Sequence, residues 1–295
     1  MGQSIDAALT TQFSDMVHTA AQQMKSRFKP YIKYKPMTGD NWAYDGLGSV
    51  EAREASGRNE SVVFSDIEHN RRKIARSRYY VALPIDGFDK LGMLIDPNEG
   101  YVQAVLMAMQ RQLDRVVASA AFATVYTGRD FSTSVTFAND GGLTVDATSG
   151  LTYEKLLEIN KNFVDGEVGN DMDIRKCMAI TGEEEEALMK ESELISGDYT
   201  RQFAIEKGEL QRAAGLDIIK FGGSANNPIL DVTSSVRSNI VLAEGGICVG
   251  VSKEIDLKIQ DRTDLVDTQQ VIATFYLGAV RTEGKLVQKL TTTDA

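Results

Sequence analysis

The stretch from residue 97 to 126 carries the longest helical pattern in this chain, and it constrains the fold more than any other feature. Asp96 and Pro97 suit a helix start, because a carboxylate caps free amides and proline lacks a donor that would be unpaired there. Gly128 suits the end. Roughly thirty residues at about 1.5 Å each make a rod of about 45 Å, longer than most globular helices. We therefore predict a helix over 97–127 that is either a central core helix or a strut of an elongated subunit. The apolar positions at helical spacing are Val102, Leu106, Met109, Leu113, Val116, Ala120 and Ala123.

Composition is typical of a soluble globular protein, with 42% apolar and 25% charged residues. The net charge of −10 is uneven: residues 1–90 hold 13 Lys/Arg against 11 Asp/Glu, and residues 91–295 hold 19 against 31. Such an acidic body disfavours sequence-independent binding along nucleic acid, which needs a basic face. No apolar run is long enough for a bilayer and no signal-peptide pattern opens the chain, so we expect no membrane partner. Cys177 and Cys248 lie in apolar runs and are predicted to be buried free thiols.

The N-terminal quarter predicts two projecting parts. Ser4 to about Phe28 has the pattern of an amphipathic helix, which either packs on the body or docks on another subunit. Strand-like residues 31–35 and 61–64 flank a polar, glycine-bearing stretch, which predicts a long two-stranded hairpin. A hairpin alone is marginally stable, and a loop of this length is usually functional. We expect Trp42 and Tyr44 in this stretch to contact a neighbour, with the Trp42 indole largely exposed in a free subunit.

A basic strip follows the hairpin, with five cations among residues 71–78. Such a cluster suits either a nucleic-acid patch or an exposed strand edge that contacts another protein. The acidic remainder of the chain favours the second interpretation. We take four arginines as candidates for contact between subunits: Arg71, Arg72, Arg76 and Arg78.

The rest of the chain mixes strands and short helices. Thr152 begins a helix, and Thr181 with Glu184 forms a capping box that begins another, with Glu186 paired to Lys190. The predicted class is α+β, with a small sheet, flanking helices, one long helix and one projecting hairpin. Strands are predicted at 79–85, 131–137, 174–180, 216–221, 240–242, 246–251, 255–259 and 271–280, with a turn at 139–142.

No catalytic motif stands out. His18 and His69 are the only histidines, and neither lies in a known nucleophile motif. The run Glu183–Glu186 splays around a helix axis, so it suits a first helical turn better than a metal site. The glycines at 245, 246 and 250 lack the spacing of a dinucleotide site. We therefore expect no enzyme, no cofactor and no metal.

The order and spacing of three passages resemble the major capsid proteins of tailed bacteriophages, which have the Hong Kong 97-type fold. The first passage is Ala82–Asp86 through Ile95–Pro97 into the long helix with Leu113–Asp114. The second is Arg175–Ile180, a helix, and then Arg212–Ile219, and the third is Tyr276–Arg281. The resemblance covers the chain from about Lys29 to Leu290.

This resemblance implies a Hong Kong 97-type capsid fold in the α+β class. Residues 1–30 would form an N-terminal arm and 31–80 the extended β-hairpin loop (E-loop) region. Residues 81–164 and 271–295 would form a peripheral domain with the spine helix 97–127. Residues 165–270 would form an axial domain, which meets its copies around the five- and six-fold axes.

The implied function is structural: a major capsid protein that self-assembles as hexamers and pentamers into an icosahedral phage head around double-stranded DNA. No long helical extension precedes the arm, so a separate scaffolding protein is expected, with a portal protein and DNA packaged without sequence-specific binding. The protein would be found in the virion after assembly in the host cytoplasm. An encapsulin-like nanocompartment shell protein around a protein cargo is the alternative. A metal-dependent hydrolase using carboxylates near Asp171–Glu186 is a third.

Overall fold

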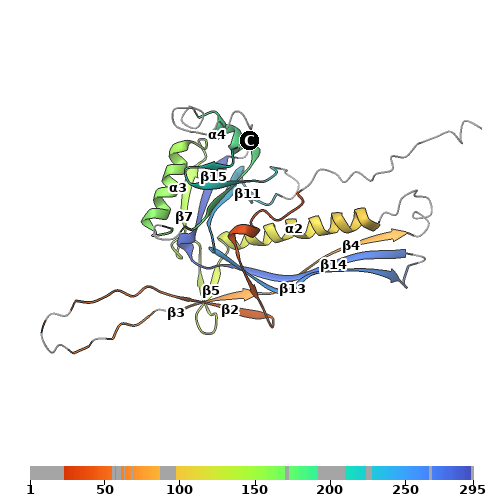
Figure 1. Ribbon diagram of the computed structural model, residues 1–295, viewed down its shortest axis with the longest axis horizontal. Coiled ribbons are helices and arrows are strands. Elements are labelled where there is room, and N and C mark those ends of the chain that lie inside the picture. Colours follow the sequence, from red (N-terminus) through yellow and green to blue (C-terminus); the bar gives the residue numbers. More distant parts are fainter. Residues whose placement is uncertain are drawn as a thin grey trace, which may run out of the picture. The chain divides into compact units, whose positions relative to one another are not determined.

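The structure is a computed structural model of the 295-residue chain. It describes residues 23–54, 57, 61–62, 64–67, 69–86, 98–169, 173–191, 210–223, 228–265 and 268–293. The described residues form three α-helices and three sheets, which confirms a strand-rich α+β class (Figure 1). By internal contacts they divide into two units. The first comprises the described residues among 1–26, 78–112 and 253–276, and the second comprises those among 27–77, 113–252 and 277–295.

The predicted long helix is confirmed as α2, which runs from Asn98 to Phe122. Its predicted start at Asp96 and Pro97 lies outside the described residues. Its predicted end is wrong, because the chain leaves the helix at Phe122 and forms strand β5 (Val125–Thr127), whose β-branched residues favour an extended backbone. Gly128, with φ of +94°, turns the chain after this strand rather than after the helix. The buried side chains of α2 recur every three or four residues and include Val105, Met109, Leu113, Val116, Val117 and Ala120.

A seven-stranded sheet forms the main core of the second unit. Its order is β7-β15-β12-β8-β10-β9, with β11 paired to β12. Its central strands β8 and β12 are largely buried, and β12 buries the polar residues Arg237, Ser238 and Asn239 together with its apolar ones. The bounds are β7 Leu143–Ala147, β8 Lys176–Ile180, β9 Arg212–Ala213, β10 Leu216–Lys220, β11 Val232–Thr233, β12 Val236–Ala243 and β15 Val287–Thr293.

Two helices add to this core. Helix α3 (Tyr153–Asp165) begins after Thr152, as predicted, and buries Leu156, Ile159 and Phe163 at helical spacing. Helix α4 (Gly182–Met189) begins at the predicted capping box of Thr181 and Glu184. The Lys190 ammonium and the Glu186 carboxylate form the predicted ion pair at 2.7 Å.

The sheet is larger than predicted. Strands β7 and β15 were not predicted, and they complete it through a parallel pairing in which Leu290 lies opposite Val145. Two predicted strands, 246–251 and 255–259, are one strand, β13 (Ile247–Arg262), since the intervening Ser252–Glu254 stays extended. Strand β14 (Thr268–Arg281) includes the predicted 271–280, and β6 (Thr133–Val135) is the middle of the predicted 131–137.

The predicted hairpin exists, but with other strands. Strand β2 (Asn41–Leu47) pairs antiparallel with β3 (His69–Ala75), in a sheet of order β2-β3-β5-β6. The first of the two strand-like segments forms β1 (Lys33–Pro36), which pairs in parallel with β13 instead. Lys33 lies opposite Cys248 in this pairing. The predicted pairing of 31–35 with 61–64 is therefore wrong, because a distant strand takes the first of these segments.

The first unit contains β4 (Ser77–Asp86) and the outer parts of β13 and β14, in a sheet of order β1-β13-β14-β4. Strand β4 confirms the predicted 79–85. The predicted N-terminal helix lies outside the described residues up to Gln22, and the described residues 23–28 are not helical. Short 3-10 turns lie at η1 (Lys29–Tyr31) and η2 (Gly284–Leu286). No helix in the described part of the chain is long and apolar enough to span a membrane.

Candidate functional site

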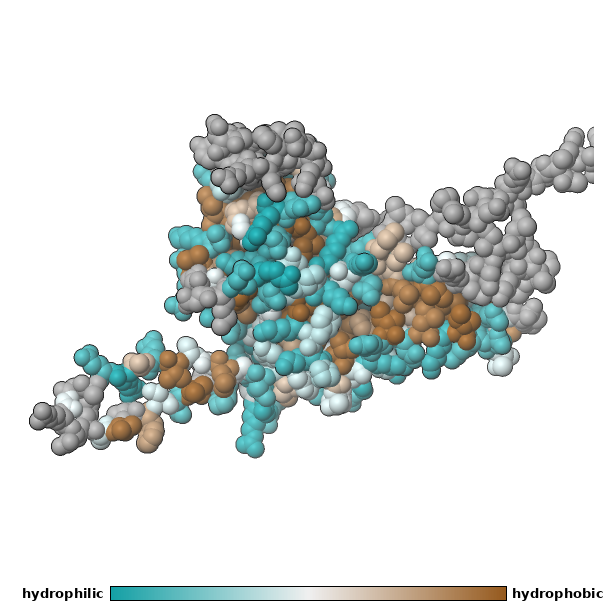
Figure 2. All heavy atoms as spheres, viewed as in Figure 1, coloured by the Kyte–Doolittle hydropathy of each residue, from teal (hydrophilic) through white to brown (hydrophobic). Residues whose placement is uncertain are grey.

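The β2–β3 hairpin carries apolar side chains that the subunit does not bury. The two strands pair from Asn41–Ala75 to Leu47–His69, and residues 48–68 connect them. Figure 2 shows hydrophobic residues at the surface along this segment. Exposed apolar side chains that gather on one segment mark surfaces for another protein. Their exposed fractions are Leu47 67%, Val50 48%, Val62 79%, Phe64 89% and Ile67 45%.

Trp42 and Tyr44 lie at the other end of the hairpin, where β2 joins the body of the second unit. Both side chains are partly buried against a cluster of apolar residues, and Trp42 lies directly opposite Ile74 in the β2–β3 pairing. The expectation of a largely exposed indole is corrected, since β3, β5, β13 and β14 together supply an apolar surface beneath it. Burial also raises the pKa of Tyr44. The cluster consists of Met37, Ile74, Val125, Cys248 and Val280.

Three of the four candidate arginines are exposed. Arg71 is paired with Asp45 at 2.7 Å, and Arg76 is paired with Asp40. The Arg78 guanidinium lies 5.2 Å from the centre of the Tyr276 ring. Exposed pairs of this kind contribute only about 0.2–1 kcal/mol, so these cations remain open to other partners.

Arg72 is different, and its selection as a surface contact is corrected. Its side chain is 3% exposed and both of its terminal nitrogens donate to Asp140, at 2.7 and 2.8 Å. Side chains alternate across a strand, so Arg71 and Arg72 necessarily face opposite sides of β3. The sequence shows this alternation but does not reveal which arginine faces inward.

Asp140 also binds Arg281, which the sequence analysis did not select. The Arg281 Nε lies 2.7 Å from the Asp140 carboxylate, and the Arg281 side chain is fully buried. Its Nη1 donates to the carbonyls of Ala121 and Ala123, at the C-terminal end of α2. Burial alone raises the pKa of Asp140, but the hydrogen bonds and charges of Arg72 and Arg281 outweigh it, so the net pKa is lowered. We call Arg72, Asp140 and Arg281 the root cluster.

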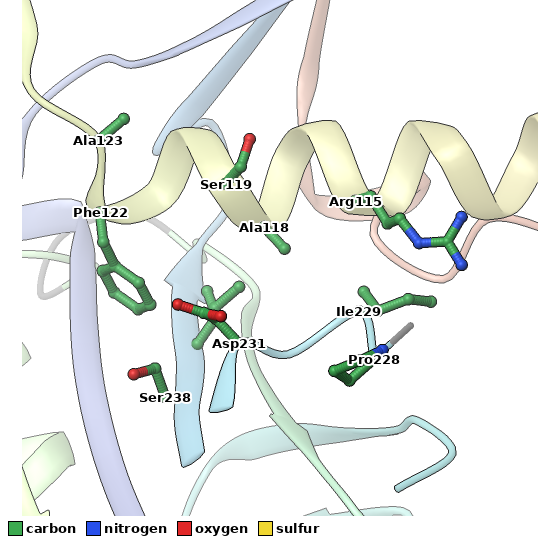
Figure 3. Close-up of a pocket in the computed structure, with 10 residues that line it drawn as sticks. Arg115, Ala118, Ser119, Phe122, Ala123, Pro228, Ile229, Asp231 and Ser238 are labelled. Carbon is green, nitrogen blue, oxygen red and sulfur yellow. The ribbon is translucent and has the colours of Figure 1, made fainter. Parts of the chain in front are cut away.

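A cavity of about 520 Å³ lies between the C-terminal half of α2 and the segment around β11 and β12 (Figure 3). Phe122 and Ala118 face it from α2, and Asp231 faces it from the other side. Its wall is mostly apolar, with Arg115 and Asp231 as the charged members. The remaining lining residues are Ser119, Ala123, Pro228, Ile229, Ser238 and Ile240.

Glu184, the residue that a metal-dependent hydrolase would need, is occupied by structural hydrogen bonds. Its carboxylate accepts from the Thr181 amide at 2.5 Å and the Thr181 hydroxyl at 2.8 Å. It also accepts from Asn239 Nδ2 and the Thr292 hydroxyl. Within the described ranges, no group of three or more His, Cys, Asp and Glu side chains gathers as metal ligands would. Asp171 lies outside those ranges.

Comparison with known proteins shows which protein family the chain belongs to. The family model of the phage capsid protein matches residues 5–293, nearly the whole chain. The chain belongs to the phage capsid protein family. A search of curated proteins gave no match.

Solved phage capsids have the same fold as this capsid protein. The capsid of cyanophage P-SCSP1u is 15% identical with a TM-score of 0.74, covering 100% of this chain and 96% of that chain. The head of Helicobacter pylori bacteriophage KHP40 is 9% identical with a TM-score of 0.75, covering 98% and 97%. The capsid of Ralstonia phage GP4 is 11% identical with a TM-score of 0.71, covering 97% and 96%.

The capsid protein is therefore a structural coat subunit of a phage virion, which confirms the function expected from the resemblance. The nanocompartment alternative is not favoured, because the matching family and these neighbours are phage capsids. The functional site of such a subunit is its contact surface with other copies. The exposed apolar part of the hairpin and the three exposed arginines are its candidates here.

Proposed function

We propose that this capsid protein is the repeating subunit of an icosahedral head of the Hong Kong 97 type, built from hexamers and pentamers around double-stranded DNA. The β2–β3 hairpin carries the proposal. Its root packs within the subunit, whereas its loop exposes Val62 and Phe64 almost completely. In a coat protein, the surface able to bury these side chains is another copy, and closed symmetry repeats that contact around the shell.

The proposed domains follow from the resemblance. The arm is 1–30, the E-loop region 31–80, the axial domain 165–270, and the peripheral domain 81–164 with 271–295. Helix α2 suits the spine helix of 97–127, and the β2–β3 hairpin suits the E-loop. Strands β7 and β15 share a core with β8 and β12, so we assign these two strands to the axial domain instead.

We further propose that Trp42, Tyr44, Arg71, Arg76 and Arg78 contact neighbouring subunits. The strongly acidic part of the chain, residues 91–295, offers a matching surface for the arginines. Arg72 is left out of this set because its guanidinium is already bound inside the subunit.

The remaining partners are proposed on the same basis. Assembly takes place in the host cytoplasm with a separate scaffolding protein and a portal protein. The acidic body suits confinement of DNA by a closed shell rather than tight binding along it.

The test is production of the protein together with the other head proteins of its phage, followed by electron microscopy. We expect closed hollow particles tens of nanometres across. A subunit that stays a folded monomer under every condition, with the scaffold present, would refute the proposal.

A charge-reversal variant, R71E/R76E/R78E, tests the arginine contacts. Like-charge contacts at an interface cost several kcal/mol, whereas exposed single charges matter little to folding. We expect a folded subunit that forms no particles. The matched control, R129E/K155E/K285E, reverses three cations outside the axial domain, of which Lys155 and Lys285 are paired within the subunit. Normal particles from the first variant would exclude these arginines as contacts.

A further inference from the structure

The base of the hairpin packs on the apolar cluster under Trp42, and its backbone pairing with a further strand is narrow. Strand β3 pairs with β5 through a single residue pair, Arg72 with Thr127. A two-stranded ribbon has little stability of its own, so its direction depends on what holds this joint. Arg72 thus links the hairpin to the second unit twice, through its backbone pairing with Thr127 and through its buried ion pair with Asp140.

The root cluster joins this residue to three other elements. Arg72 of β3 donates twice to Asp140, in the turn before β7, and once to the Arg281 carbonyl of β14 at 3.1 Å. Arg281 in turn binds Asp140 and the last carbonyls of α2. A bidentate arginine–carboxylate pair fixes an angle as well as a distance, because both groups are planar.

The charges within the cluster do not cancel. Two guanidinium groups share one carboxylate, which leaves one excess positive charge in a buried place. The C-terminal end of α2 carries the negative end of the helix dipole and stabilises such a cation. The Phe137 ring, 5.1 Å from the Arg281 guanidinium carbon, contributes further. The cluster therefore loses much of its stabilisation when any one member is removed.

Close backbone contact makes the joint sensitive to angle. A Cβ atom at Gly278 of β14 would lie 2.1 Å from the Ala75 carbonyl oxygen, so β14 and the end of β3 touch without a side chain between them. A loop residue such as Gly57 lies up to about 40 Å of extended chain beyond Tyr44. A rotation of about 10° at the root then moves the tip by up to about 7 Å, which is enough to miss a docking site.

We propose that Arg72, Asp140 and Arg281 are positioning residues for assembly, which set the direction of the β2–β3 hairpin so that its loop meets a neighbouring subunit. This proposal rests on the proposed function, in which the hairpin contacts another copy. The cluster acts through the hairpin and makes no contact with the neighbour itself.

The experiment is hydrogen exchange on the free full-length subunit, together with particle formation in the presence of the other head proteins. In R72Q, amides of 41–47 and 69–75 are expected to exchange about tenfold faster or more, while the seven-stranded sheet keeps its protection. Particle yield is expected to fall in the same variant. R72K keeps the cation but lacks the planar fork, so it should restore protection only in part.

The control is R212Q, which removes an exposed arginine paired with Asp217 and should leave hairpin exchange unchanged. Unchanged exchange of 41–47 and 69–75 in R72Q would overturn the positioning role and leave the proposed function standing. A loosened hairpin with normal particles would overturn the link between hairpin direction and assembly and leave the hairpin contact of the proposed function standing. Loss of protection throughout the sheet in both R72Q and R72K would also overturn the proposal, since the cluster would then be a general determinant of folding.

Discussion

Replacing Glu184 with alanine tests whether this carboxylate is a structural acceptor or a metal ligand. Four donors converge on it, from Thr181, Asn239 and Thr292, and these residues are at most 3% exposed. The two hydroxyls can rotate toward other acceptors, but the Thr181 amide and the Asn239 side chain cannot. A buried donor left without a partner costs about 1–3 kcal/mol. Two such donors make E184A about 4 kcal/mol less stable than the wild type.

The assay is thermal unfolding of the free subunit, supported by urea titration. A loss of about 4 kcal/mol corresponds to a fall in Tm of roughly 6 °C for a chain of this size. The matched control is E183A, because Glu183 is exposed in the same helical turn and contributes only about 0.3–1 kcal/mol through the helix dipole. Equal and small effects of the two variants would refute the structural account. Stoichiometric binding of a divalent metal by the wild type that is lost in E184A would instead support the hydrolase alternative.

Three further perturbations test the hairpin root. W42A should destabilise the free subunit by about 1–2 kcal/mol, because the indole is already half-buried in it. Quenching of wild-type Trp42 fluorescence by iodide should be intermediate before assembly and lower in particles. Quenching as strong as that of free tryptophan before assembly would contradict this. The lowered pKa of Asp140 means that its stabilising effect is complete above the ordinary value of 3.8 and is lost as pH falls below it. The protection factors of the hairpin amides, which compare the observed exchange with the intrinsic rate at each pH, should therefore fall under acid in the wild type. In D140N these protection factors should be low at every pH, and an acid response that persists in D140N would exclude Asp140 as its source. G278A should also loosen the hairpin, since the added methyl group meets the Ala75 carbonyl, whereas G182A has free space and should leave it unchanged; equal exchange in the two variants would contradict the close contact.

Local sequence patterns predicted the elements that are stabilised by contacts between residues a few positions apart. The period of the apolar residues in α2 and α3 and the capping box of α4 are such signals, and the structure contains all three. The end of α2 was misjudged because Gly128 is a common helix stop, whereas the β-branched residues before it already favour a strand.

These local patterns did not predict which distant strands and side chains pair with each other. Strand β1 pairs with a strand more than 200 residues away, so its alternation suggested a local hairpin partner that the fold does not use. The root cluster joins Arg72 to Asp140 across 68 positions and Asp140 to Arg281 across 141. Nothing in the sequence around Arg281 distinguishes it from an exposed arginine, and only the burial of β14 identifies it.

The position of β15 in the seven-stranded sheet has a consequence for how the subunit is made. This strand, residues 287–293, lies between β7 and β12, so the sheet cannot close until the ribosome has synthesised these residues. Pairings between distant segments also form slowly, because a long chain must be brought together first. A nascent chain therefore lacks the finished sheet for most of its synthesis. A chain that stopped before residue 287 would leave β7 and β12 without the strand that pairs with both.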